Sequence, residues 1–189
     1  MALGACQPAA TFFQPAALRA VAAALASNGT GALALALAAQ WPEALVTAVD
    51  RSADALALAG ENTEKLGFSG RVKLVRSDWF SELAGGGPYE LIVANPPYLS
   101  AEETAEAEIE VRVHEPAGAL TAADSGLADL RTIIAGARDF LASGGLLALE
   151  TGIDQHAALA ELLAGTGYVA VESVRDLTDR DRFMFARKA

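Results

Sequence analysis

The segment from Leu91 to Tyr98 constrains the fold of this 189-residue chain more than any other stretch. Its first half is the apolar run Leu-Ile-Val-Ala, which is typical of a strand covered on both faces, as in a parallel sheet. Its second half begins Asn-Pro-Pro, and backbone pairing should end there because proline has no N–H to donate. We therefore expect Asn95 at the carboxyl end of a buried strand, where open α/β sheets bind their ligands.

Strand-like and helix-like segments alternate along most of the chain. The sequence predicts strands at 45–49, 72–75, 91–94, 146–149, 168–174 and 182–186, and helices at 52–66, about 127–141 and about 155–163. Gly144-Gly145 is expected to end the second helix. This alternation predicts an α/β, doubly wound, mostly parallel sheet. No helix joins the last two strands, so the final one should be antiparallel, as in the Rossmann-like class I methyltransferases rather than the dehydrogenases.

The residue types after the strand at 91–94 suit the methylation of a planar nitrogen. The lone pair of an amide or exocyclic amine is delocalised, so this nitrogen is a weak nucleophile. The Asn95 side-chain oxygen and a proline carbonyl can accept its N–H protons and align it with the activated methyl group of S-adenosylmethionine. Pro96 and Pro97 would hold the carbonyl direction, and Tyr98 would stack on the planar group. An ordinary strand-end turn is the alternative, because Asn and Pro are common there.

The composition indicates one globular domain. Hydrophobic residues make up 52% and charged residues 20% of the chain, whose length suffices for a substantial core. The richest apolar stretch, 31–39, is too short to span a membrane, and the start does not resemble a signal peptide. The single cysteine, Cys6, cannot form an internal disulfide, which favours a reducing cytoplasm. One cysteine and two histidines make a metal site improbable.

Acidic residues outnumber basic residues by 24 to 14, which gives a net charge of −10. Five glutamates follow the Asn-Pro-Pro-Tyr turn, at positions 102, 103, 106, 108 and 110. Enzymes that act on nucleic acids normally surround the site with Lys and Arg, so this charge favours a protein substrate. A solvated helix face is the alternative reading of the glutamate run.

Two carboxylates follow expected strands at positions that suit a nucleoside cofactor. Asp50 ends the strand at 45–49, where an acid can bind both ribose hydroxyls. Asp78 and Trp79 follow the strand at 72–75, where a side chain and an aromatic ring can hold adenine. The alternative is a local role, since acids at strand ends also cap the next helix.

Seven stretches, taken in order, resemble the release-factor glutamine methyltransferases, the HemK/PrmC family. The matching stretches are Thr47–Asp50, Ser77–Phe80, Ile92–Tyr98, Glu115–Leu120, Asp124–Leu127, Glu150–Gly152 and Asp176–Phe183. The resemblance extends from about residue 29 to residue 187. It implies S-adenosylmethionine-dependent N5-methylation of a glutamine amide, in the family a Gly-Gly-Gln loop of a translation release factor. Ribosomal-protein glutamine methyltransferases are a close sister possibility.

The resemblance also implies roles for individual residues. Asn95, Pro96 and Tyr98 would hold the amide, with Pro97 beside them. Asp50 would bind the ribose, and Asp78 with Trp79 would lie at the adenine. Glu115-Pro116 would support the wall of the site. His114 is more typical of a loop or surface histidine than of a catalytic base.

The chain departs from the family pattern near its start. We divide it into a leader at 1–14 and a methyltransferase domain at 15–189, without the helical N-terminal domain of the family. The family's cofactor loop, Asp-x-Gly-x-Gly-x-Gly, corresponds to residues 25–31, with Leu25 in place of the acid and Ser27 in place of the first glycine. The remaining residues of this loop that are expected to bind cofactor are Asn28, Gly29, Thr30 and Gly31. The alanine-rich run before it favours helix over strand, so we expect the central first strand to be missing or degraded.

Two other functions remain open from the sequence. A nucleic-acid amino-methyltransferase would use Asn-Pro-Pro-Tyr by the same chemistry, although the acidic charge disfavours it. A pseudoenzyme would keep the fold and bind a partner without turnover, and the altered loop at 25–31 supports that alternative.

Overall fold

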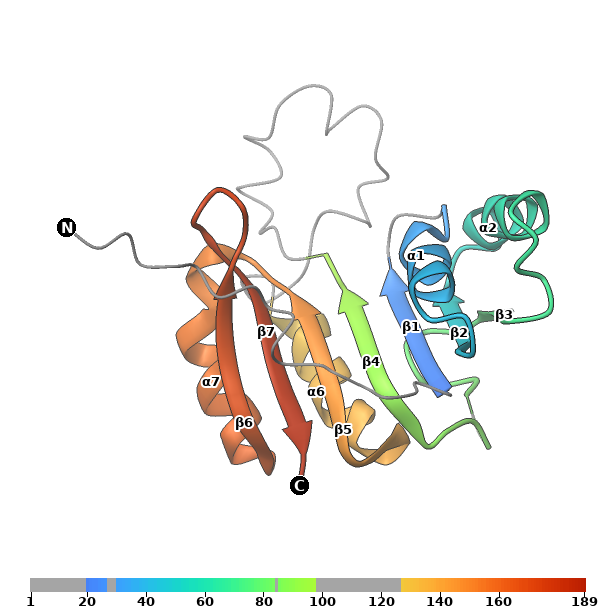
Figure 1. The fold of residues 1–189 in the computed structure, drawn as a ribbon. Coiled ribbons are helices and arrows are strands. Elements are labelled where there is room, and N and C mark those ends of the chain that lie inside the picture. The colour runs from blue at the N-terminus through green and yellow to red at the C-terminus, as the bar shows by residue number, and fades with distance from the viewer. Residues whose placement is uncertain (1–19, 27–29, 84, 98–126) are drawn as a thin grey trace.

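The computed structural model describes the backbone of residues 20–26 and the full residues 30–83, 85–97 and 127–189. In chain order its elements are β1 (Ala20–Ala26), α1 (Ala32–Gln40), β2 (Leu45–Asp50), α2 (Ala53–Lys65), β3 (Val72–Arg76), β4 (Tyr89–Asn95), α6 (Ala128–Phe140), β5 (Leu141–Glu150), η2 (Ile153–Gln155), α7 (His156–Gly165), β6 (Tyr168–Arg175) and β7 (Asp181–Lys188). The described strands form one seven-stranded sheet in the order β3-β2-β1-β4-β5-β7-β6 (Figure 1).

The sheet has the predicted mixture of strand directions. β3, β2, β1, β4 and β5 run parallel to one another, whereas β7 is antiparallel to both β5 and β6. The order reverses at β1, which lies beside both β2 and β4, and in open α/β sheets ligands bind at such a reversal. The predicted fold class is therefore confirmed.

The central first strand is formed. β1 pairs with β2 on one side and with β4 on the other, and both registers shift between Ala23 and Leu25. The expectation that alanine would favour helix here is wrong, because a position between two strands supplies ladder partners on both sides and overrides the weak helix propensity of alanine.

The boundary between α6 and β5 also differs from the prediction. The helix ends at Phe140 and the strand begins at once with Leu141, so Gly144-Gly145 lies inside β5 and does not end the helix. Pairing with β4 moves from Tyr89–Leu141 to Leu91–Leu146, which leaves a bulge at these glycines. Gly144 has a φ of 73°, and a Cβ on Gly145 would lie 2.9 Å from the Ala142 carbonyl oxygen. A bulge with such backbone geometry requires glycine.

Apolar side chains cover the two faces of the sheet in separate clusters. On the face toward α6 and α7, here called the α6–α7 face, the sheet residues pack against helix residues such as Ile133, Ile134 and Leu159. On the other face, here called the α1 face, residues of β2 to β5 pack with Ala34, Leu37 and their neighbours. Figure 1 shows α6 and α7 behind the sheet and α1 in front of β1 and β2.

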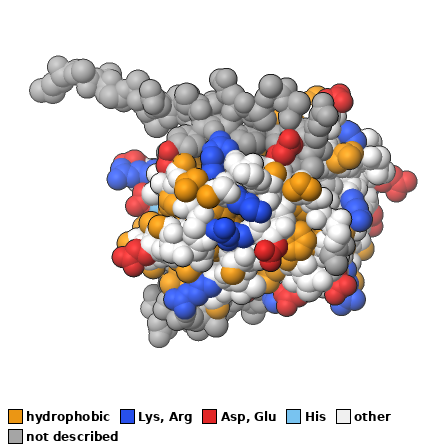
Figure 2. Space-filling model, turned by 90° about the horizontal axis from the view of Figure 1, so that it is seen from below, with side chains coloured by type: hydrophobic (Ala, Val, Ile, Leu, Met, Phe, Trp, Pro, Cys, Tyr) orange, Lys and Arg blue, Asp and Glu red, His pale blue; other side chains and the backbone are white. Residues whose placement is uncertain are grey.

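The amino edge of the parallel strands carries basic side chains. Lys188 at the end of β7 donates from Nζ to the carbonyls of Arg138 (2.6 Å) and Leu141 (2.8 Å), and Arg187 Nη1 donates to the Gly144 carbonyl (2.9 Å). Figure 2 views the molecule from below and shows Lys and Arg side chains near the middle of that face. These contacts tie the end of the chain to the start of β5.

No helix in the described part of the chain is long and apolar enough to cross a membrane.

Candidate active site

The candidate site lies at the carboxyl edge of the sheet, around the end of β1. Asp50 is the last residue of β2 and Asn95 the last residue of β4, so they flank β1 from its two sides. Asn95 pairs with Ala26, and Val49 pairs with Leu25. The structure thus brings together two of the residues singled out from the sequence.

A cavity of about 540 Å³ opens at this edge and continues along the α1 face. Asp50 and Asn95 line it together with Thr30 and Gly31, which precede α1. Its volume lies within the range of about 300–1,000 Å³ that is usual for small-molecule sites. Four predicted site residues therefore share one cavity.

Asp50 lies half-buried at the end of β2. Its Oδ1 accepts a hydrogen bond from the backbone N–H of Ser52 at 2.7 Å, and the Ser52 hydroxyl in turn caps α2 by accepting from the N–H of Ala55 at 3.2 Å. Burial raises the pKa of the Asp50 carboxyl above its usual value, although the Ser52 hydrogen bond and the charge of Arg51 act in the opposite direction. The backbone N–H of Arg51 also contributes a hydrogen bond to this carboxyl, so Asp50 has a local role before α2 and at the same time lines the cavity.

The start of α1 faces the same cavity. Gly31 is the N-cap with a φ of 70°, and a Cβ at this position would lie 2.9 Å from the Ala59 Cβ of α2. Glycine is therefore required twice, by the left-handed backbone and by the close approach of α2. The Thr30 hydroxyl accepts a long hydrogen bond from the Ala32 N–H at 3.3 Å, and the Thr30 carbonyl accepts from Asn62 Nδ2 at 3.0 Å. These contacts aim the positive end of α1 at the cavity, which suits an anionic group.

The residues after β4 are partly described. Asn95 is half-buried, and Pro96 and Pro97 are buried. Tyr98 lies outside the described residues, as do Ser27, Asn28 and Gly29 of the loop before α1 and the stretch with His114, Glu115 and Pro116. Their predicted roles remain predictions.

Asp78 and Trp79 do not line the cavity. Asp78 is exposed, and Trp79, with a φ of 50°, packs against the apolar cluster of the α6–α7 face. The turn is held by buried Ser77, whose Oγ donates to the Trp79 carbonyl at 3.0 Å and accepts from the Glu82 N–H at 3.0 Å. The structure therefore assigns Trp79 a packing contact, and its predicted contact with adenine is not tested.

Sequence reasoning missed part of the cavity wall. Glu150 at the end of β5 and Phe183 near the start of β7 face each other across the ladder, and both line the cavity. Phe185 and Trp41 line it further along the α1 face. The first two lie in stretches that carried the family resemblance, but their spacing alone does not show that β7 lies next to β5.

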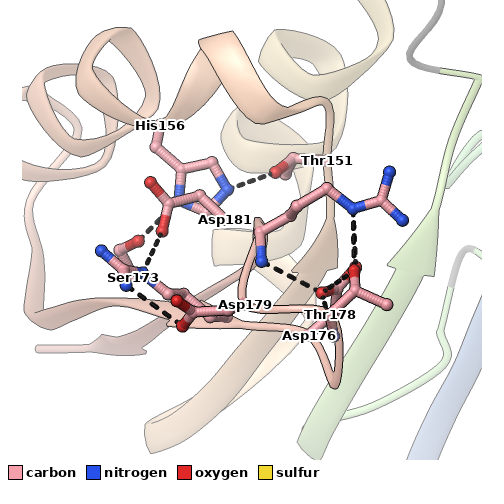
Figure 3. A network of polar contacts seen from close by, with 9 residues as sticks. Thr151, His156, Ser173, Asp176, Thr178, Asp179 and Asp181 are labelled. Atoms are coloured by element: carbon pink, nitrogen blue, oxygen red, sulfur yellow. Dashed lines mark hydrogen bonds and ion pairs between the residues drawn. The ribbon is translucent and has the colours of Figure 1, made fainter.

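Sequence reasoning also missed a polar network around His156, next to the end of β5 (Figure 3). The buried His156 ring contacts the Thr151 hydroxyl through Nε2 at 2.8 Å and the Ser173 hydroxyl through Nδ1 at 2.7 Å. Arg182 Nη1 donates to the Thr151 carbonyl at 3.0 Å, and the Thr151 N–H donates to the Arg182 carbonyl at 2.9 Å. Burial lowers the pKa of His156, with an opposing effect of Asp181 and a supporting effect of Arg182. This network fixes the turn after Glu150 against β7.

Comparison with known families identifies the domain. Residues 22–127 match the model of the methyltransferase small domain, which is more than half of the chain. The chain belongs to the methyltransferase small domain family. The match contains most of β1 and all of β2, β3 and β4, and so includes Asp50 and Asn95, the two strand-end residues of the cavity.

Curated relatives of this methyltransferase small domain chain have a common name. It is 45% identical over 160 residues to a release factor glutamine methyltransferase of Salmonella typhimurium, covering 85% of this chain and 57% of that protein. The proteins of the same name from Escherichia coli (43% over 160 residues, 85% and 57%) and Gloeobacter violaceus (41% over 158 residues, 83% and 55%) are similar. The chain thus spans little more than half of the length of these relatives.

Solved structures share the fold. A methyltransferase from Pyrococcus furiosus superposes with a TM-score of 0.66 at 18% identity, covering 95% of this chain and 79% of that one. A ribosomal protein L11 methylase from Lactobacillus delbrueckii subsp. bulgaricus gives 0.64 at 20% identity, with 95% and 74% covered. These likenesses support the methyltransferase small domain architecture and carry no information on the substrate.

Proposed function

We propose that this chain is an S-adenosylmethionine-dependent methyltransferase that modifies the side-chain amide of a glutamine in a protein, with a peptide chain release factor as the substrate. The observation that carries the proposal is the position of Asn95 at the end of β4, in the same cavity as Asp50 and the start of α1. The names of the relatives that are 41–45% identical support the choice of glutamine and of a release factor.

The described cavity residues fit the cofactor. The N-terminus of α1 suits the carboxylate of its amino-acid part, since the first N–H groups of a helix carry partial positive charge. The Asp50 carboxylate lines the cavity at the end of β2, where an acid suits the two ribose hydroxyls. We assign Ser27, Asn28 and Gly29 to the same loop, and Asp78 with Trp79 to the adenine end. When bound, S-adenosylmethionine supplies a methyl group activated by a sulfonium.

Asn95 would hold the substrate amide. Its side-chain oxygen accepts one N–H of the glutamine, and the Pro96 carbonyl accepts the other, which places the nitrogen in line for transfer. Both contacts strengthen as positive charge develops on the nitrogen, so they favour the transition state over the ground state. Pro97 stiffens the turn, and Tyr98 would stack on the amide plane.

We propose a Gly-Gly-Gln loop as the target and the cytoplasm as the compartment, because release factors act there in translation. The activity is assigned to residues 15–189. A net charge of −10 disfavours a nucleic-acid substrate, because phosphate contacts require Lys and Arg.

The proposal is tested by measuring cofactor binding and methyl transfer on the same preparation. The wild-type chain should bind S-adenosylmethionine in calorimetry and transfer labelled methyl to the glutamine of a purified bacterial release factor. Asn95→Ala should keep cofactor affinity within about threefold and lose at least about a hundredfold in kcat, the cost of losing a group that acts in the transition state.

The outcomes separate this proposal from its alternatives. A folded chain that binds no cofactor would be a pseudoenzyme. Cofactor binding with transfer only to RNA or DNA would indicate a nucleic-acid amino-methyltransferase. Unchanged transfer by Asn95→Ala would disprove the assignment of Asn95 while leaving the activity in place.

A further inference from the structure

The hairpin between β6 and β7 carries the most exposed large apolar residue of the described chain. Leu177 is fully exposed, whereas the other exposed residues of this kind range from 44% to 59%. Burying a leucine side chain stabilises a fold by about 1.5–3 kcal/mol relative to leaving it exposed, and the exposed Leu177 does not contribute this stabilisation. A single exposed leucine is ordinary on a protein surface, and its surroundings decide whether it has a role.

The loop around Leu177 is held in one conformation by its neighbours. Asp176 Oδ1 accepts hydrogen bonds from the Thr178 hydroxyl (2.6 Å), the Thr178 N–H (2.8 Å) and the Arg180 N–H (3.1 Å). The Thr178 and Arg180 bonds hold the pKa of Asp176 below its usual range, so the carboxylate is ionised at neutral pH. Figure 3 shows Asp176 and Thr178 at the centre of these contacts. The backbone on both sides of Leu177 is thus fixed before any partner binds.

The charges of the loop are paired within it. Arg175 contacts Asp179 at 3.1 Å and Asp181 at 3.3 Å, and Asp176 faces Arg180 at 3.8 Å and Arg182 at 3.9 Å. Three arginines therefore match three aspartates, and the tip offers no net positive charge to phosphate groups. This pairing disfavours a nucleic acid or an anionic membrane as the partner and leaves the leucine as the recognition element.

The hairpin tip lies at the same edge of the sheet as the candidate active site. β7 is antiparallel to β5, so its start lies beside the carboxyl end of β5, where Phe183 faces Glu150 and both line the cavity. β7 and β4 are two strands apart, or about 10 Å at the usual strand spacing. Figure 1 shows the hairpin at the end toward which β1 and β4 point. A folded protein that places a side chain at Asn95 would therefore also reach this tip.

We propose that the β6–β7 hairpin is a docking element for the folded protein substrate, with Leu177 inserted into an apolar recess of that protein beside its target glutamine. This inference rests on the proposed function and adds a recognition surface outside the cavity. A rigid loop loses little conformational entropy on binding, so a single apolar side chain can contribute measurable affinity. A short peptide that carries only the glutamine loop would not reach the tip.

The test compares a folded substrate with a peptide. For Leu177→Ala, we expect KM for a purified bacterial release factor to rise about tenfold at unchanged kcat, because burial of the larger side chain contributes to uniform binding. kcat/KM for a synthetic Gly-Gly-Gln peptide should not change. Leu177→Met, which keeps the apolar volume, should behave like the wild type. Leu66→Ala, an exposed leucine that caps the end of α2, is the matched control and should change neither substrate.

Direct binding of the release factor, measured by calorimetry without turnover, separates the two proposals. Wild-type binding that Leu177→Ala weakens about tenfold supports the docking element even if no methyl is transferred. Methylation of the release factor with an unchanged KM in Leu177→Ala overturns the inference and leaves the proposed function in place. Equal effects on protein and peptide, self-association through Leu177 without a change in KM, or a wild-type chain that neither binds nor methylates the release factor would also overturn it.

Discussion

On the α6–α7 face, α6 and α7 cover β4, β5 and β7 and bury Ile133, Ile134 and Leu159 completely. On the α1 face, the same three strands border the cavity of about 540 Å³, and its wall includes Leu91, Leu146 and Phe185. Among the described residues, one face of the sheet is thus filled by side chains, and the other borders the cavity. The same strands therefore contribute to the core on one side and to the wall of the candidate site on the other.

Each face also has one titratable group whose charged form is disfavoured by burial. Asp50 lines the cavity, and burial raises its pKa. His156, at the start of α7, is held between two hydroxyl groups, and burial lowers its pKa. In both cases the protein disfavours the charged form, but only Asp50 lies where a ligand could compensate for that cost.

Neighbouring leucines of β5 give the largest expected contrast between the faces. Leu147 packs in the α6–α7 cluster and Leu146 lines the cavity, and both are nearly inaccessible to solvent. Leu147→Ala should lower the free energy of unfolding by about 4 kcal/mol, because it removes contacts on all sides and leaves a new void. Leu146→Ala should cost about 2 kcal/mol, because one side of the residue already faces space.

Urea denaturation followed by circular dichroism measures both variants, and equal m values would validate the comparison. If the two substitutions cost the same, the cavity is not a real difference between the faces. Cofactor affinity gives a second comparison: it should change in Leu146→Ala, which alters the cavity wall, and not in Leu147→Ala.

Asp50 gives the next largest expected effect. Its substitution should weaken cofactor binding without lowering the stability of the fold. Its raised pKa means that its contribution to stability is complete below the unfolded pKa and is lost as pH rises through the folded pKa. At neutral pH the ionised carboxylate therefore opposes folding. Asp50→Asn keeps an oxygen for the Ser52 N–H, so the free energy of unfolding should stay the same or rise. Cofactor affinity should fall about ten- to a hundredfold, for a lost charged hydrogen bond of about 1.5–3 kcal/mol.

Calorimetry with S-adenosylmethionine and urea denaturation are run on the same protein. Asp54→Asn removes an equal charge from the first turn of α2 outside the cavity wall, and should leave cofactor affinity unchanged. An Asp50→Asn variant that binds as tightly as the wild type would reduce Asp50 to its capping role.

Most of the sheet could be predicted because apolar runs and their terminators are local signals. The run that ends at Asn95 and the one that ends at Asp50 have the predicted boundaries within one or two residues. The formation of β1 cannot be predicted from local propensity, because it depends on two partner strands that are remote in sequence. The glycines at 144 and 145 were assigned to a helix end because a bulge and a stop have the same local sequence.

The site was predictable where it consists of strand ends and unpredictable where it depends on packing. Asp50 and Asn95 could be placed at one edge, since the ends of parallel strands lie together. Phe183 could not, because its position depends on the pairing of β7 with β5. His156 could not be predicted for the same reason: its two hydroxyl partners, Thr151 and Ser173, come from the turn after β5 and from β6, respectively.

His156 gives the smallest expected effect. Its contribution to stability should depend on pH in the opposite direction to that of Asp50. Its pKa is lower in the folded chain than in the unfolded chain, so the unfolded state binds more protons near neutral pH. The stability that depends on the neutral ring is complete above the unfolded pKa of about 6.5 and is lost as pH falls toward the folded pKa. Lowering the pH from about 8 to about 5.5 should therefore reduce the free energy of unfolding, whereas the carboxyl of Asp50 acts in the opposite direction.

Urea denaturation at a series of pH values measures this slope in the wild type and in His156→Gln. The variant should be less stable at neutral pH, because it loses the contacts of the ring with Thr151 and Ser173, but its stability should vary less between pH 8 and 5.5. The two curves should converge on acidification. Parallel curves would mean that protonation of His156 does not contribute, and that the α6–α7 face tolerates the charge. Such a result would mean that the loss of stability at low pH comes from other groups. The two faces would then not differ in the pH dependence expected from His156 and Asp50.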